Sequence, residues 1–285
     1  MKDIGIPVVT GPGSQPAESD GAEMSFMQMP SGMSTFESPL IPEPEEIQGL
    51  EPALEMATRL QAILADYRVD QSAQRIDITA LDAHNRQFFD QLLGEGEVSV
   101  LCDTGLKVRI QESVLAGVWR VQTLDEDDGL VRDTIEVADV PALVRHRTFA
   151  DAQVNIDVES LQIPSDIYNA APLLTEISDK LGEFRAGDEP HVINLSLLPH
   201  TEQDLTFLSD CLGIGPVIIL SRGYGNCRIS STATSNLWWV QYFNSQETLI
   251  LNTLEISSVP EVACAAQEDI SDSHHRLREI LSIYR

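Results

Sequence analysis

Basic residues are scarce in this sequence. Lys and Arg number 18 against 45 Asp and Glu, which gives a formal net charge of -27 at pH 7. A surface of this sign repels the phosphates of nucleic acids and anionic lipids, and it attracts basic partners over a screening length of about 8 Å at physiological salt. The composition therefore argues against nucleic-acid binding and favours a basic protein partner.

Long apolar runs are also lacking. The longest, around Val217–Leu220 and Leu237–Val240, have the length of strands, and none approaches the ~20 apolar residues that a membrane span needs. Gly11, Pro12 and Gly13 interrupt the N-terminus where a signal peptide would need a continuous apolar segment. The sequence therefore predicts a cytoplasmic protein that does not insert into membranes.

Cysteines are few and isolated. None of the four, at positions 102, 211, 227 and 264, forms a Cys-x-x-Cys pair or stands at zinc-site spacing from a histidine. We interpret them as reduced thiols that behave as small apolar residues. The sequence offers no sign of a cofactor.

Patterns typical of catalytic and metal sites are missing as well. Asp125–Gly129 is rich in carboxylates but lacks the remaining ligands of an EF-hand loop, which favours a solvated hairpin tip. His274 and His275 are adjacent, so on a helix they point about 100° apart and cannot easily chelate one metal. No Ser/His/Asp or Cys/His spacing suggests a nucleophile with its base. We expect no catalytic and no metal-binding residues, because an enzyme would need a site assembled entirely by the fold.

The sequence does contain an internal repeat. A shift of 119 residues aligns 88–143 with 207–262 without a gap and gives 16 identical pairs, among them Trp119 with Trp238. Ordinary composition would give about three or four identities over that length. We interpret the repeat as a duplication, and the matched tryptophans as core residues.

Each copy has the same predicted order of elements. A helix, a short extended piece and a second helix precede four extended runs that turn-rich residues separate. The predicted helices are 54–66, 82–93, 173–184 and 201–212, and the predicted strands are 97–102, 106–112, 117–124, 130–137, 216–221, 225–231, 236–243 and 249–256. The predicted fold class is α+β, with two tandem, pseudo-symmetric copies of a helix–helix–antiparallel meander unit.

The remaining segments complete the predicted domain organisation. Residues 1–50 form an irregular arm rich in Pro, Gly and Met, either a disordered tail or a segment that folds on a partner or on the body. The first repeat spans 51–147, a linker spans 148–171, and the second repeat spans 172–285. The second repeat ends in a predicted helix at about 272–283.

Candidate partner-binding residues lie where the two copies now differ. The second copy has a distinctive glycine-rich hairpin, which is either a plain tight turn or a loop presented to a partner. Its residues are Gly223, Tyr224, Gly225, Asn226 and Cys227. Trp239 replaces Arg120 of the first copy and shares a strand face with Phe243. That aromatic face suits either a contact between the repeats or a partner surface.

Several segments resemble the HupH/HyaF family of hydrogenase expression/formation proteins. They are Gly11–Pro16, Leu92–Val100, Gly117–Val121, Gly223–Gly225, Pro260–Val262, Ala265–Asp269 and Asp272–Ser273. They run in order from the arm almost to the C-terminus, so the resemblance covers nearly the whole chain.

The resemblance implies a role in maturing membrane-bound, hydrogen-uptake nickel–iron hydrogenases. It implies a non-catalytic accessory protein or chaperone that binds an immature subunit before export. The small subunit is the favoured partner, and the large subunit and other maturation proteins are further ones. Small subunits of this type carry basic twin-arginine export signals, again by resemblance, and an acidic chain could shield that signal or an apo cluster-binding segment. The alternatives are an enzyme, a redox or metal carrier acting on the same client, and a structural subunit retained in the mature hydrogenase.

Overall fold

The computed structural model of the chain describes residues 48–69, 71–103, 107–222 and 225–284. The first half contains α1 (Glu51–Asp66), β1 (Gln74–Asp77), α2 (Ala83–Leu93), β2 (Val98–Asp103), β3 (Lys107–Glu112), β4 (Val118–Leu124), β5 (Leu130–Val137) and α3 (Ala142–Arg147). The short 3-10 helix η2 (Val158–Ser160) follows. The second half contains α4 (Ala170–Glu183), β6 (His191–Asn194), η3 (Leu195–Leu197), α5 (Glu202–Leu212), β7 (Val217–Ser221), β8 (Asn226–Ser231), β9 (Leu237–Phe243), β10 (Leu249–Ile256), η4 (Glu261–Ala263) and α6 (Gln267–Ser282).

One antiparallel sheet of ten strands runs through both halves, with the order β1-β5-β4-β3-β2-β7-β8-β9-β10-β6. Its centre is the pairing of β2 with β7, in which Val100 lies opposite Ile219. These two residues are 119 positions apart. Outward from this pair, β3, β4, β5 and β1 follow on one side, and their equivalents β8, β9, β10 and β6 follow in the same order on the other. The mixed α+β class predicted from the sequence is confirmed.

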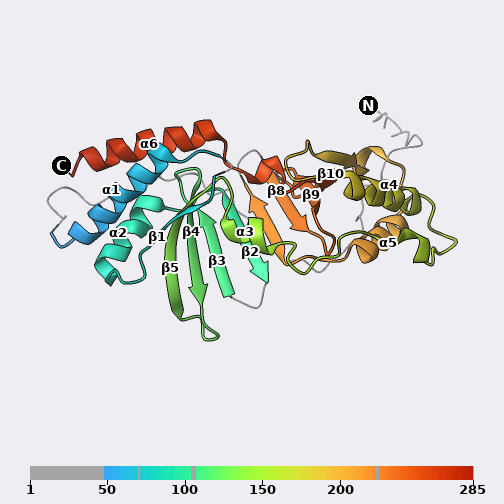
Figure 1. Cartoon of the computed structure of the whole chain (residues 1–285), viewed down its shortest axis with the longest axis horizontal. Coiled ribbons are helices and arrows are strands. Elements are labelled where there is room, and N and C mark those ends of the chain that lie inside the picture. The colour runs from blue at the N-terminus through green and yellow to red at the C-terminus, as the bar shows by residue number, and fades with distance from the viewer. Residues whose placement is uncertain (1–47, 70, 104–106, 223–224, 285) are drawn as a thin grey trace, which may run out of the picture.

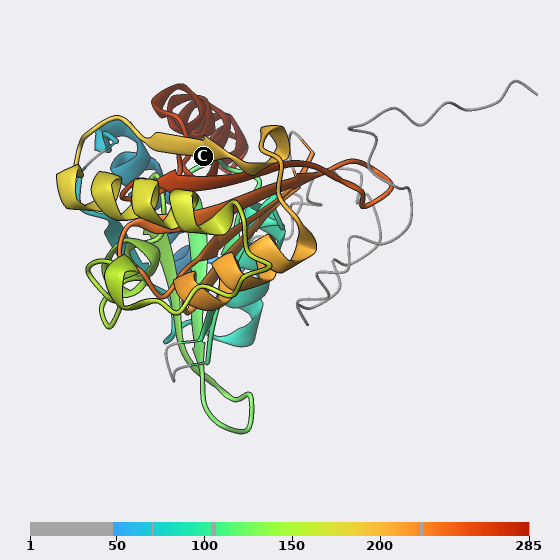
Figure 2. The same cartoon turned by 90° about the vertical axis from the view of Figure 1, so that its right-hand side faces the viewer.

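The helices cover the two ends of one sheet face. Val118 and Ile135 pack with α1 and α2 at one end, and Leu237 and Trp239 pack with α4 and α5 at the other. On the opposite face, the buried side chains of the central strands form a third cluster that contacts α3 and η4. Figure 1 shows the two helix pairs at the ends of the molecule with α3 between them, and Figure 2 shows α4 and α5 from the second end.

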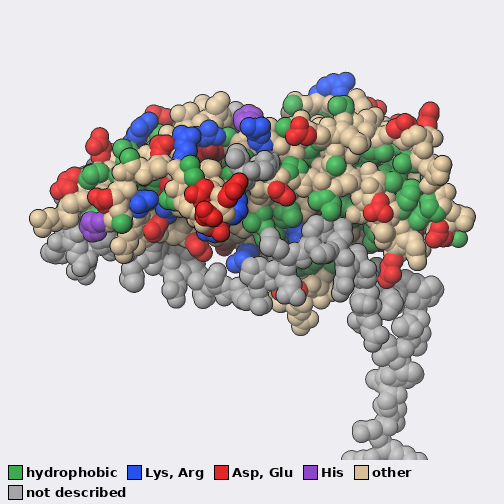
Figure 3. Space-filling model, turned by 90° about the horizontal axis from the view of Figure 1, so that it is seen from below, with side chains coloured by type: hydrophobic (Ala, Val, Ile, Leu, Met, Phe, Trp, Pro, Cys, Tyr) green, Lys and Arg blue, Asp and Glu red, His purple; other side chains and the backbone are tan. Residues whose placement is uncertain are grey.

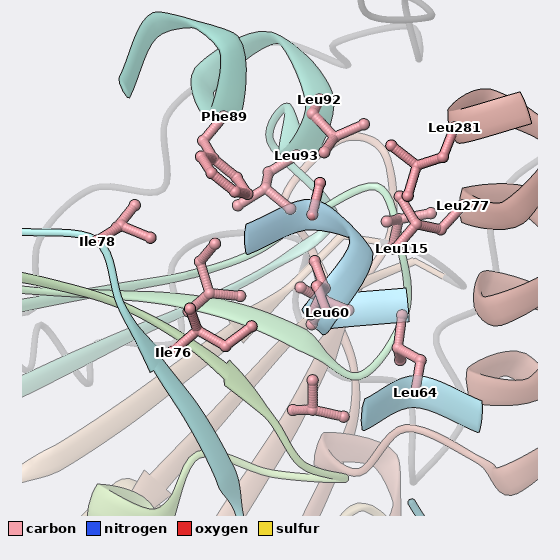
Figure 4. Packing of buried hydrophobic residues seen from close by; sticks show 14 of the residues in the cluster. Leu60, Leu64, Ile76, Ile78, Phe89, Leu92, Leu93, Leu115, Leu277 and Leu281 are labelled. Carbon is pink, nitrogen blue, oxygen red and sulfur yellow. The ribbon is translucent and has the colours of Figure 1, made fainter. Parts of the chain in front are cut away.

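The last helix crosses to the first half. Ile270, Leu277 and Leu281 of α6 join the cluster that α1 and α2 form on the sheet. Figure 4 shows Leu277 and Leu281 pointing toward Leu60 and Leu64 of α1. The core of the first half is therefore completed by residues from the end of the chain.

Capping side chains begin the helices at equivalent positions of the two halves. Asp82 caps α2 by accepting a hydrogen bond from the backbone N–H of Asn85 at 2.9 Å. Thr201 and Asp204 form a reciprocal capping box at α5. These side chains satisfy N–H groups that have no partner inside the helix. Each cap lies at the predicted start of its helix, residue 82 or 201.

The predicted elements agree closely with the observed ones. Gly94 and Gly213 end α2 and α5 at positive φ, +54° and +66°, as expected for glycine after a helix. The C-terminal helix begins earlier than predicted, at Gln267, and no side chain caps its first turn. The predicted arm, residues 1–50, lies outside the described residues except for its last three.

Candidate functional site

The glycine-rich hairpin predicted as a partner-binding loop is described in part. Gly223 and Tyr224 lie outside the described residues. Gly225 is exposed and has φ +108°, which suits glycine, and Asn226 begins β8 directly opposite Phe243 of β9. Three of the predicted residues therefore meet at one end of the β8–β9 pair.

Cys227 points to the opposite face of the sheet. Its side chain is 2% exposed, and burial raises the pKa of the thiol to about 12, although a hydrogen bond with Tyr242 lowers it. Burial likewise raises the pKa of Tyr242 to about 12 and raises the pKa of the nearby Glu255 carboxyl. A thiol held in its neutral form is a poor nucleophile and a poor metal ligand. This cluster therefore favours a structural role for Cys227.

Trp239 lies beneath α4 and α5 in the core of the second half. It is 8% exposed, and its indole N–H donates a hydrogen bond to Oδ1 of Asn252 at 2.5 Å. Phe243, four residues further along β9, is half-buried beyond that cover. Trp239 therefore offers little surface to a partner, whereas Phe243 offers more.

Between the two helix pairs, the sheet face carries two cross-strand rows of side chains. Strand register defines the first row as Gln122, Arg109, Leu101, Ile218 and Ser230, and the second as Gln241, Arg228, Leu220, Ser99 and Gln111. A shift of 119 residues converts one row into the other. All ten side chains are half-exposed or exposed. We call these two rows, with Phe243, the central face.

The central face combines an apolar middle with two arginines. Leu101 is 36% exposed, and Ile218 and Leu220 beside it are half-exposed. Arg109 and Arg228 flank this middle on opposite sides, at equivalent positions. The guanidinium of Arg228 stands 5.9 Å from the ring centroid of Phe243, within cation–π range, and burial lowers its pKa.

Different interactions border the central face in the two halves. In the first half, Arg120 binds the buried Asp133 at 2.7 Å and pairs with Asp90 of α2. Burial lowers the pKa of Arg120, but hydrogen bonds to these two carboxylates outweigh that effect and raise it. In the second half, Trp239 and Asn252 occupy the positions of Arg120 and Asp133. The border is ionic on one side and neutral on the other.

Carboxylates also line a surface hollow of about 480 Å³ along α4. Its lining residues are Pro172, Thr175, Glu176, Asp179, Lys180 and Glu183. Lys180 pairs with Glu183 at 2.8 Å, and His191 lies 2.9 Å from Glu176. Of the three carboxylates that line the hollow, Glu183 has the ammonium group of Lys180 as its direct counter-ion. Figure 3 shows charged side chains of both signs on the face seen from below, with hydrophobic ones gathered toward the second half.

Sequence reasoning missed the central face although the signal was present. Arg109 matches Arg228, and Gln122 matches Gln241, in the alignment of the two copies. Both pairs are polar and identical, and strand alternation places both opposite the buried tryptophans. Identical polar residues on the face away from the core are candidates for function or for shared hydrogen bonds.

Within the described residues, no group of three or more His, Cys, Asp or Glu side chains could hold a metal ion. The described helices include none that is both long and apolar enough to cross a membrane.

The family model described as "HupH hydrogenase expression protein, C-terminal conserved region" matches residues 51–157 and 167–284. The chain belongs to this family. Hydrogenase expression/formation protein HupQ of Azotobacter chroococcum mcd 1 is 47% identical over 277 residues, which cover 96% of each chain. Hydrogenase expression/formation protein HoxQ of Cupriavidus necator is 46% identical and covers 99% of this chain and 98% of its own.

More distant members are also similar. Hydrogenase-1 operon protein HyaF of Escherichia coli is 31% identical and covers 95% of this chain and 93% of its own. A solved structure, hydrogenase expression protein HupH from Thiobacillus denitrificans, is 31% identical, covers 40% of this chain and 95% of that chain, and gives a TM-score of 0.37.

Proposed function

We propose that this protein is a cytoplasmic accessory protein, acting as a chaperone, in the assembly of a nickel–iron uptake hydrogenase. The observation that carries the proposal is its similarity, over nearly the whole chain, to proteins named for hydrogenase expression and formation. We infer that it binds an immature hydrogenase subunit before export, and that the small subunit is the client. The large subunit and other maturation proteins are the further partners we consider.

The charge of the chain supports a role in binding a basic segment. The net charge of -27 attracts a basic export signal, of the kind that the family resemblance implies for the small subunit, at low ionic strength. Bound to this protein, such a signal would be shielded until the cofactors of the subunit are in place. Attraction between exposed charges weakens with salt, which makes the mechanism testable.

A salt-dependent pull-down tests the proposal. The full chain would be used to capture the small and large subunits, each separately, and the small subunit with and without its signal peptide. We expect capture of the small subunit that requires the signal peptide and decreases between 50 and 500 mM salt, because the Debye length shortens from about 14 Å to about 4 Å over this range. Capture of neither subunit contradicts the chaperone function, and capture that salt leaves unchanged contradicts the charge mechanism.

The alternative is an enzyme or a redox or metal carrier that acts on the same client. Cys227 is the residue that tests it, because it belongs to the glycine-rich hairpin predicted to bind a partner. Loss of hydrogenase maturation in Cys227→Ser, with unfolding unchanged, would favour the alternative. Stoichiometric metal in the purified protein would do the same. Burial and the raised pKa of Cys227 support the opposite expectation, that the variant still matures its client.

We also infer that the two halves arose by duplication of one unit, with the first repeat at 51–147, a linker at 148–171 and the second repeat at 172–285. The gapless alignment, the symmetric strand order and the two matched ranges of the family model support this. Under this inference, the central face is built from equivalent strands of both copies.

A further inference from the structure

The central face is unusual for so acidic a protein. The chain has only 18 basic residues, and two of them, Arg109 and Arg228, occupy equivalent positions on this one face. Arg109 is exposed, Leu101 is 36% exposed, and the neighbouring Ile218 and Leu220 are half-exposed. A sheet face that is apolar in the middle and positive at both sides is complementary to a ligand with the opposite arrangement.

We propose that the central face binds a segment of the hydrogenase client that carries apolar side chains between carboxylates. This rests on the proposed function and names which part of the client this surface recognises. The segment is distinct from the basic export signal. Arg109 and Arg228 repel the two arginines of such a signal, whereas they attract a pair of carboxylates. The protein therefore uses two surfaces of opposite sign for two segments of one client.

Strand geometry sets the spacing of the recognised charges. Arg109 on β3 and Arg228 on β8 are separated by three inter-strand steps, which at about 4.8 Å each place their backbones roughly 15 Å apart. A helix of about ten residues spans this distance. Carboxylates near the two ends of such a helix, with leucine-like side chains between them, would meet the arginines and the apolar middle together.

The two arginines are not equivalent in their surroundings. Arg228 is half-buried and stands over the ring of Phe243, so its guanidinium is held in place. Leu124, at the position equivalent to Phe243, offers Arg109 no ring. Because a preorganised side chain loses less entropy on binding, Arg228 contributes more to affinity than Arg109.

The test uses the full chain, both hydrogenase subunits and a charge-matched control. The variant Arg109→Glu/Arg228→Glu reverses the central face. The control Arg59→Glu/Arg278→Glu makes the same change of net charge on exposed positions of α1 and α6. Circular dichroism and unfolding midpoints establish that both variants fold. We expect the central-face variant to lose at least tenfold in affinity for the captured subunit, and the control to stay within about twofold of the original chain.

Peptides then identify the segment. Fifteen-residue peptides tiled over the captured subunit, and one spanning residues 21–47 of this chain, would be measured by fluorescence anisotropy. We compare the peptides whose binding the Arg109→Glu/Arg228→Glu variant weakens. We expect them to carry two or more carboxylates around apolar residues, and to bind Arg228→Gln more weakly than Arg109→Gln. The proposal is overturned if the peptides that lose affinity in this variant are basic, or if the peptide of residues 21–47 outcompetes every one of them.

The outcomes separate this proposal from the function on which it rests. Capture of a subunit by the original chain and equally by the folded Arg109→Glu/Arg228→Glu variant overturns the role of the central face and leaves the chaperone function standing. Capture of neither subunit overturns both. A change in the oligomeric state of the free protein in that variant, with capture unaltered, assigns the face to a contact between copies and also overturns the proposal.

Discussion

The two halves of the molecule pair their buried polar side chains differently at one position of the sheet. At the same sheet position, the first half buries an ion pair between Arg120 and Asp133, and the second half buries a hydrogen bond between Trp239 and Asn252. Asp133 is 0% exposed and Asn252 is 5% exposed. In both cases a buried polar atom has its partner, which a low-dielectric interior requires.

The comparison shows that both members of the pair differ between the halves. A tryptophan beside Asp133 would leave a buried carboxylate without its cation, and an arginine beside Asn252 would leave a charge without a counter-ion. In the first half, Arg120 also pairs with Asp90 of α2, whereas α5 has Ser209 at the equivalent position. The second half is therefore neutral at a site where the first half is charged.

The largest expected effect comes from placing the tryptophan of the second half at position 120 while its partner in the first half is left unchanged. Arg120→Trp leaves Asp133 buried without its cation, and we expect it to lower the free energy of unfolding by about 3–5 kcal/mol. Completing the exchange with Asp133→Asn and Asp90→Ser should recover more than half of that loss. Urea unfolding followed by tryptophan fluorescence measures both. A triple variant no more stable than Arg120→Trp would show that the side-chain pairs of the two halves are not interchangeable.

The second prediction concerns the helix that crosses between the halves. Leu277 is 0% exposed and packs in the core of the first half, so Leu277→Ala should cost about 2–5 kcal/mol. Hydrogen exchange should quicken in α1 and stay unchanged in α4. The matched control is Leu174→Ala, a fully buried leucine of α4, which should show the reverse pattern. Equal loss of protection in both helices would contradict the separation of the two cores.

The third prediction uses Asn85 and Asp204, which are equivalent and nearly fully buried. Asp204 accepts hydrogen bonds from Thr201, Asn169 and Ala170. Burial raises its pKa, but these hydrogen bonds outweigh burial and lower it below the ordinary value of an aspartate.

Because the folded-state pKa is lowered, ionised Asp204 contributes stability that is complete above about pH 4 and is lost as the pH falls further. Asp204→Asn should therefore cost about 1 kcal/mol at pH 7 and progressively less in acid. Asn85 instead donates to the carbonyl of Gly49, so Asn85→Asp should be destabilising at pH 7 and less so in acid. Thermal unfolding between pH 2 and 7 measures both, and a pH-independent cost of Asp204→Asn would be evidence against the assignment.

The smallest expected effect concerns the different neighbours of the equivalent residues Glu136 and Glu255. Glu136 binds Arg75 at 2.7 Å, but the equivalent Glu255 lies opposite Val192, which is 50% exposed. Burial raises the pKa of Glu255, and a hydrogen bond from Thr253 lowers it only in part. A raised carboxyl pKa lowers stability as the pH rises above its ordinary value of about 4.3.

Val192→Arg should flatten this decline between pH 5 and 8 and add about 0.5 kcal/mol at pH 7. Val131→Arg, on the exposed side of β5, is the control and should leave the pH profile unchanged. An identical profile for both variants would mean that an arginine at position 192 does not pair with Glu255.

Sequence reasoning predicted the elements because their signals are local. The strand predicted at 130–137 is observed at Leu130–Val137, and the tryptophans predicted as core, Trp119 and Trp238, are 1% and 0% exposed. Alternation along each strand and glycines after helices act within a few residues. Such signals place an element without knowledge of its neighbours.

The rest of the fold and of the candidate site depends on contacts far apart in the sequence. The pairing of Val100 with Ile219 and the packing of Leu277 on α1 join residues more than one hundred positions apart. Alternation correctly placed Trp239 and Phe243 on one face, but only the positions of α4 and α5 show that Trp239 is covered. The central face was missed although its matched polar residues are visible in the sequence, because only the structure shows that the two halves share one sheet.

The crossing of α6 to α1 has a consequence for how the chain is made. During synthesis the first half emerges from the ribosome long before Leu277 and Leu281 are available to cover α1. Domains usually fold as units from the N-terminus during synthesis, but this core lacks part of its apolar surface until translation ends. In the nascent chain, α1 therefore stays incompletely buried until the last residues have been synthesised.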